Sequence, residues 1–139
     1  MASRRSALQI FDRRHRSPAT RIVAVSAAGA SAMVESWRAG RAIEHENVET
    51  IADGIATKSP IPEALQDMHG LVDDALLVSD AAMIRGMKML HVHAGVVAEP
   101  SAAAGVAAIL ENREAFAGLS AGLVVCGGNL TEAQMRTWL

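Results

Sequence analysis

Short apolar runs alternate with longer amphipathic stretches along this chain. Residues 21–26 and 75–78 are aliphatic runs of the kind that forms buried strands, and residues 122–126 make a third. We expect helices over 3–16, 30–39, 60–71, 80–93, 101–111, 113–118 and 131–139. This alternation predicts an α/β fold with three layers, in which a mostly parallel sheet is flanked by helices.

Local signals mark several helix boundaries. Ser79 is a favourable N-cap for the helix that begins at residue 80, and Gly40 is typical of a helix C-terminus. Pro100 stands where a helix accepts proline, in its first turn. Thr131-Glu-Ala-Gln134 has the spacing of a capping box, which predicts where the last helix begins.

Cys126 closes the third apolar run and is followed by Gly127, Gly128 and Asn129. Because parallel sheets bind ligands at the carboxyl ends of their strands, this turn is a candidate binding site. The glycines would let a ligand approach the backbone, and the thiol could point into a pocket. The alternative is that Cys126 is a small buried core residue, as most free cysteines are.

Glu99 is a carboxylate inside the apolar segment Gly-Val-Val-Ala-Glu-Pro. A carboxylate in such surroundings needs either a partner or a function. It could instead be a helix-terminal carboxylate that accepts hydrogen bonds from the amides of its own helix. Asp53-Gly54 is a further candidate for the same site, although Asp-Gly is also ordinary turn chemistry.

Charge and composition restrict the classes of function. The 139 residues suffice for one domain, or part of one, and their net charge of −2 gives no overall attraction to nucleic acid or membranes. Arginines crowd residues 4–16, where we expect a solvated helix face or terminus. A basic arm that binds nucleic acid is the alternative. No stretch has the ~18 consecutive apolar residues of a membrane span.

Cysteine and histidine usage favours a cytoplasmic protein without a metal centre. Cys126 is the only cysteine, so an internal disulfide is excluded. Residues 1–16 lack the apolar run of a signal peptide. His91 and His93 have no third ligand near them in the sequence, and we expect no metal site. We therefore expect a single cytoplasmic domain over residues 1–139.

Four sequence blocks resemble a known enzyme family when taken in order. They are Glu49-Thr-Ile-Ala-Asp-Gly-Ile55, Leu71-Val-Asp-Asp-Ala-Leu-Leu-Val-Ser79, Val97-Ala-Glu-Pro-Ser-Ala-Ala-Ala-Gly105 and Cys126-Gly-Gly-Asn129. This series resembles the C-terminal half of the pyridoxal-phosphate-dependent threonine/serine dehydratases (ammonia-lyases) and serine racemases. These enzymes are of the tryptophan-synthase β type. The resemblance runs from about Arg21 to about Asn129 and implies part of the family's large domain.

The resemblance implies a role for each block. Cys126 matches the serine or cysteine that hydrogen-bonds the pyridine nitrogen of the cofactor, and Gly127 matches the turn after it. Glu99 matches the carboxylate near the cofactor ring. Asp53 and Gly54 match a loop beside the pocket. The implied cofactor is pyridoxal phosphate, and the implied substrates are serine- or threonine-type amino acids.

Departures from the family pattern are also specific. The family forms its Schiff base through a lysine in an N-terminal Ser-x-Lys-x-Arg-Gly segment, whereas the two lysines here, Lys58 and Lys88, lie in no such segment. No glycine-rich phosphate loop precedes the strand at 22–25. Acidic positions of the family's cation site fall near Ser26 and Ala32. We therefore expect the small domain to be absent and the chain alone to be inactive. It would form homo-oligomers, complement an N-terminal half, or act as a non-catalytic interaction module.

Overall fold

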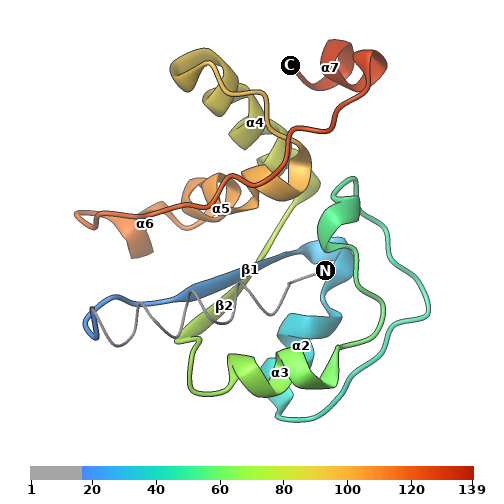
Figure 1. Ribbon diagram of the computed structural model, residues 1–139, viewed down its shortest axis with the longest axis vertical. Coiled ribbons are helices and arrows are strands. Elements are labelled where there is room, and N and C mark those ends of the chain that lie inside the picture. The colour runs from blue at the N-terminus through green and yellow to red at the C-terminus, as the bar shows by residue number, and fades with distance from the viewer. Residues whose placement is uncertain (1–16) are drawn as a thin grey trace.

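The computed structural model describes residues 17–139 as two strands and a set of helices (Figure 1). The expected helix over 3–16 and the arginine cluster at 4–16 lie outside the described residues. The elements are β1 (Val23–Ala27), η1 (Ala28–Ala30), α2 (Ala32–Ala39), η2 (Asp53–Ile55), α3 (Pro62–Met68), β2 (Asp74–Val78), α4 (Asp80–Ala94), α5 (Pro100–Glu111), α6 (Arg113–Phe116) and α7 (Glu132–Trp138).

The two strands form a parallel sheet between two layers of helices. β1 pairs with β2 in a register that runs from Val23 opposite Asp74 to Ala27 opposite Val78. Figure 1 shows α2 and α3 on one side of this sheet and α4 and α5 on the other. The α/β class with helices on both faces is therefore confirmed. No helix in the described part of the chain combines the length and apolarity needed to cross a membrane.

The prediction of a third strand over residues 122–126 is wrong. These residues are assigned to no strand, and the sheet formed by residues 17–139 has two strands only. A strand needs a neighbouring backbone to accept and donate its hydrogen bonds. No strand of the described chain lies beside this segment, so a strand-like sequence remains without the ladder that defines a strand.

Small residues let the layers approach closely. The core cluster holds two larger side chains, Val78 and Met83, among alanines of β1, α4 and α5. A Cβ on Gly86 of α4 would lie 3.1 Å from the Ala103 carbonyl oxygen of α5, so α4 and α5 pack almost backbone to backbone. The alanines of α5 are therefore needed for its close packing against α4, in addition to favouring a helix.

The first residues of α4 fix two distant segments. Ser79 is the N-cap: its Oγ accepts a hydrogen bond from the Ala82 amide (3.1 Å) and donates to Glu111 Oε1 at the end of α5 (2.6 Å). Asp80 accepts hydrogen bonds from the Thr50 hydroxyl (2.6 Å) and the Ile51 amide (3.0 Å). Asp80 thereby holds the loop that leads to Gly54.

Other predicted boundaries agree within a few residues. Gly40 ends α2 with φ of 65°, a left-handed conformation that glycine adopts at little cost. The Thr131–Gln134 capping box is present with both of its hydrogen bonds. Helix α3 stops at Met68 and α6 at Phe116, a few residues earlier than expected.

Candidate functional site

Glu99 occupies the junction between the 95–98 linker and α5. Its backbone carbonyl accepts hydrogen bonds from the amides of Ala102 and Ala103, each at 3.1 Å. Its side chain makes no capping hydrogen bond to α5. The half-buried carboxylate instead accepts the Asn129 amide at Oε2 (3.2 Å). The interpretation of Glu99 as a carboxylate satisfied by its own helix is therefore wrong.

Two glycines far apart in sequence flank this carboxylate. A Cβ on Gly127 would lie 2.8 Å from Glu99 Oε2, and a Cβ on Gly54 would lie 3.4 Å from Glu99 Oε1. Real Cβ atoms do not tolerate the first of these distances, so Gly127 is required for the carboxylate to sit where it does. The structure thus brings together Gly54, Glu99 and Gly127, three of the residues that the sequence assigned to one site.

The backbones of 97–99 and 127–129 run side by side at this point. The Glu99 amide donates to the Gly127 carbonyl oxygen (3.0 Å). A Cβ on Gly128 would lie 2.6 Å from the carbonyl oxygen of Val97. The two glycines that follow Cys126 are therefore explained by close backbone contact with the segment that carries Glu99.

Cys126 is solvent-exposed and free. The alternative that it is a buried core residue is wrong. Within residues 17–139 its thiol makes no hydrogen bond, and it precedes Gly127 at the edge of the Glu99 cluster. An exposed, unpartnered thiol is open to a hydrogen-bonding partner from outside the described chain.

Two residues of this site were not predicted from the sequence. Ser101 Oγ is buried with no hydrogen-bond partner in the described structure, and it would lie 2.8 Å from a Cβ on Gly54. The position of Asp80 at the α4 N-terminus indicates only a favourable charge, whereas in the structure it also anchors the Thr50–Gly54 loop through Thr50 and Ile51. Ser101 lies two positions after Glu99, and this proximity in sequence could have indicated that it belongs to the same site.

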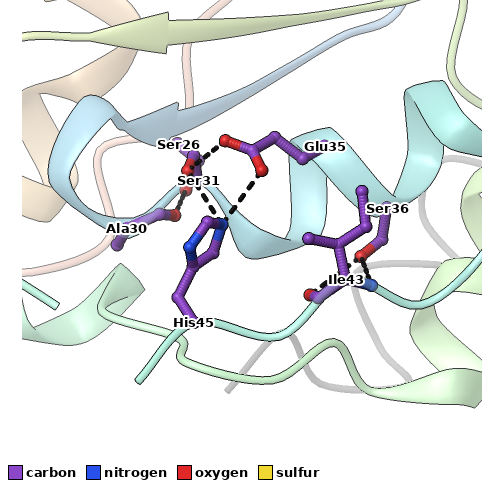
Figure 2. Close-up of polar contacts among 7 residues, drawn as sticks. All are labelled: Ser26, Ala30, Ser31, Glu35, Ser36, Ile43 and His45. Carbon is purple, nitrogen blue, oxygen red and sulfur yellow. Dashed lines mark hydrogen bonds and ion pairs between the residues drawn. The ribbon is translucent and has the colours of Figure 1, made fainter. Parts of the chain in front are cut away.

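A second polar cluster joins α2 to the loop after it (Figure 2). The Ser31 hydroxyl donates to Glu35 Oε1 (2.6 Å), and His45 Nε2 lies 3.0 Å from Glu35 Oε2. The hydrogen bond from Ser31, followed by that from His45, lowers the pKa of Glu35 below its ordinary value. All three side chains bond one another, so this cluster holds the 41–48 loop on α2.

Positions that resemble the family's cation site carry no carboxylate. The Ser26 hydroxyl donates to the Ala30 carbonyl oxygen (3.0 Å), as Figure 2 shows, and Ala32 is fully buried. His91 and His93 lie in the exposed last turn of α4. Across residues 17–139, no group of three or more His, Cys, Asp or Glu side chains is placed to hold a metal ion.

Comparison with known proteins identifies the family. Residues 9–127 match the sequence profile described as pyridoxal-phosphate dependent enzyme. The chain belongs to this family. It is 34% identical over 120 residues to the biosynthetic L-threonine dehydratase of Bacillus subtilis, a match that covers 86% of this chain and 28% of that protein. It is 35% identical over 114 residues to the β-hydroxyaspartate dehydratase of Paracoccus denitrificans, covering 81% of this chain and 36% of the relative.

Solved structures of the family share this fold. The threonine deaminase of T.th. superposes with a TM-score of 0.81 at 30% identity, over 90% of this chain and 46% of that chain. Maize serine racemase superposes with a TM-score of 0.83 at 29% identity, over 94% of this chain and 41% of the racemase. The chain therefore spans less than half the length of the relatives that it matches.

The described residues fit one side of a cofactor of this family. Gly54 and Gly127 present no side chain, and this leaves the room that the Glu99 carboxylate itself occupies. Ser101 contributes a buried hydroxyl without a partner, and Cys126 an exposed thiol. These are groups suited to hydrogen-bonding a ring, and a phosphate would need cationic or amide donors in addition.

Proposed function

We propose that this chain supplies the ring-binding wall of a pyridoxal-phosphate-dependent threonine/serine ammonia-lyase. The observation that carries the proposal is the packing of the Glu99 carboxylate between Gly54 and Gly127, the residue that follows Cys126. That convergence is what the family resemblance implied for these positions. It also agrees with the similarity to enzymes named threonine dehydratase and serine racemase.

The chemistry follows from the types of these residues. Bound pyridoxal phosphate supplies the electron sink for β-elimination of the hydroxyl of a serine- or threonine-type substrate. Cys126 would hydrogen-bond the pyridine nitrogen as a neutral thiol, which does not firmly protonate it. Glu99, held by the Asn129 amide, would place its carboxylate beside the ring. The products of such a reaction are a 2-oxo acid and ammonia.

The proposal includes that the chain by itself has no lyase activity. A lyase of this family needs a lysine amine at the reacting carbon, both to hold the cofactor and to move the α-proton. Lys58 and Lys88 are both exposed. Purified chain incubated with pyridoxal phosphate and L-threonine should produce no 2-oxobutanoate, and its production would contradict this part of the proposal.

A chimera tests the ring-binding role directly. Residues 21–129 of this chain would replace the matched segment of the Bacillus subtilis threonine dehydratase. We expect the chimera to retain pyridoxal phosphate through dialysis, as read from its absorbance. Cys126→Ala should weaken retention, whereas Cys126→Ser, which keeps a hydrogen-bonding group, should preserve it. Equal retention of pyridoxal phosphate by the two variants would show that Cys126 does not hydrogen-bond the cofactor.

A second candidate function is that of an interaction module in the cytoplasm. The specific observation is an exposed apolar segment at Leu123, Val124 and Val125, which are 43%, 83% and 40% exposed. Apolar surface of this kind drives association. The chain would then dimerise or complement a separate N-terminal half of the fold. A stable monomer in size-exclusion chromatography, with and without such a half, would contradict this function.

A further inference from the structure

The carboxylate of Asp80 begins a chain of hydrogen bonds that leads to the turn carrying Gly54. The Thr50 hydroxyl donates to Asp80 Oδ1 (2.6 Å) and accepts the amide of Ala52 (3.2 Å). Asp80 Oδ2 accepts the amide of Ile51 (3.0 Å). One carboxylate of α4 therefore fixes three consecutive residues ahead of the turn, either directly or through the Thr50 hydroxyl.

The turn itself, η2, has a buried base and an exposed tip. Ala52 is fully buried in the core cluster, and its carbonyl oxygen accepts the amide of Ile55 (3.1 Å). Ile55 packs against the same cluster. Asp53 and Gly54, which lie between them, are exposed. The place of Gly54 is therefore set by the base of the turn, and this base is the part that Asp80 anchors.

The two glycines beside Glu99 are held in different ways. On one side, the Glu99 amide donates to the Gly127 carbonyl oxygen (3.0 Å), and Glu99 Oε2 accepts the Asn129 amide (3.2 Å). On the other side, a Cβ on Gly54 would lie 3.4 Å from Glu99 Oε1 and 2.8 Å from Ser101 Oγ. Within residues 17–139, no hydrogen bond joins η2 to Glu99 or Ser101. This second contact is one of packing alone, so it depends on the anchor of the turn.

We propose that Asp80 is a positioning residue for the ring-binding wall, and that it acts through Thr50 on the place of Gly54 beside Glu99. Both carboxylate oxygens of Asp80 accept hydrogen bonds from the loop, so its role is to hold this loop and not to bind a ligand. A site is held in its working geometry by such supporting hydrogen bonds behind the residues that bind. The inference rests on the proposed function only where it concerns the cofactor.

Four variants separate this role from a general effect on stability. Thr50→Val removes the hydroxyl and leaves α4 intact, whereas Thr50→Ser keeps the hydroxyl and should restore the wild-type behaviour. Asp80→Ala removes the carboxylate, and with it a favourable charge at the N-terminus of α4. Ser79→Ala is the matched control, because it weakens the same end of α4 but loses contacts with Ala82 and Glu111 only. Circular dichroism verifies that each variant folds, and Thr50→Val decides the matter if Asp80→Ala does not.

The first measurement uses the whole chain without cofactor. The amide resonance of Gly54 in a nitrogen–proton NMR spectrum reports the surroundings of the turn. We expect this resonance to move in Thr50→Val and in Asp80→Ala, and to keep its wild-type position in Thr50→Ser and Ser79→Ala. An unmoved Gly54 resonance in Thr50→Val, or an equal movement in Ser79→Ala, would overturn the proposal.

The second measurement places the same variants in the chimera described above. Thr50→Val and Asp80→Ala should weaken the binding of pyridoxal phosphate by about tenfold, the loss expected for one hydrogen bond to a charged group. Thr50→Ser and Ser79→Ala should bind it like the parent chimera. Parent-like affinity in Thr50→Val would overturn the role toward the cofactor. A parent chimera that retains no pyridoxal phosphate would instead contradict the proposed function, while the Gly54 resonance would still decide whether Asp80 positions the turn.

Discussion

Substituting Gly29 with alanine tests how the fold positions its loops. Gly29 lies in η1, between β1 and α2, against the backbone of the 48–52 loop. A Cβ there would overlap the Glu49 carbonyl oxygen and lie 2.7 Å from its carbonyl carbon. The Gly29 carbonyl also accepts the Glu49 amide at 3.0 Å. Both obstacles are backbone atoms that cannot rotate away, so the loop must move and break this hydrogen bond.

The expected cost follows from these two effects. Overpacking of this kind costs about 1–3 kcal/mol, and loss of a hydrogen bond about 0.5–1.5 kcal/mol. Gly29→Ala should therefore lower the free energy of unfolding by about 2–4 kcal/mol. Urea denaturation followed by circular dichroism would show this as a lower midpoint with an unchanged slope.

Gly122→Ala is the matched control for this substitution. No atom lies within 4 Å of a Cβ at Gly122, and its φ is not positive, so alanine is accommodated there. Its free energy of unfolding should stay within about 0.5 kcal/mol of wild type. The steric argument is refuted if Gly29→Ala unfolds at the same urea concentration as Gly122→Ala.

Three further predictions concern polar groups. Ser79→Ala removes the α4 N-cap and the contact with Glu111, and should cost about 1–2 kcal/mol in urea denaturation; a cost near zero would deny the cap its role. The pKa of Glu35 is lowered in the folded chain. Its carboxylate therefore stabilises the fold at pH values above 4.5, the ordinary pKa of the group. That contribution is lost as pH falls through the folded pKa. The stability difference between wild type and Glu35→Gln should therefore shrink in acid, and a difference independent of pH would contradict the role given to Ser31 and His45. Cys126 should react fully with a thiol reagent in the native state, whereas reaction only after denaturation would place the thiol inside the fold.

Local patterns in the sequence predicted most of the elements. Two of the three aliphatic runs became β1 and β2, and helices formed where residues such as Ser79 and Gly40 mark the ends. These signals depend on a few neighbouring residues, so they are legible without the tertiary structure. The strand expected at 122–126 depends on a neighbouring strand as well as on its own β-prone residues. Pairing is non-local, and the propensity of Val124 and Val125 could not reveal that the partner is missing from the described chain.

The candidate site was predictable only in part. Spacing alone left Glu99 and Cys126 with two interpretations each, and the family resemblance grouped them with Gly54 and Gly127. The structure confirms that Gly54, Glu99 and Gly127 meet, while their roles toward the cofactor remain predictions. The anchoring of Thr50 by Asp80 joins residues 30 positions apart, and nothing in either local sequence indicates that contact.

The junction of β2 and α4 restricts how the length of this protein can vary in evolution. Ser79 binds Glu111 at the far end of α5, and the next residue, Asp80, binds Thr50 in the loop that leads to Gly54. One inserted residue would turn the following helical positions by about 100° around the helix axis, which would detach at least one of these partners. Insertions and deletions between orthologues should therefore be absent at this junction and accumulate in exposed loops elsewhere.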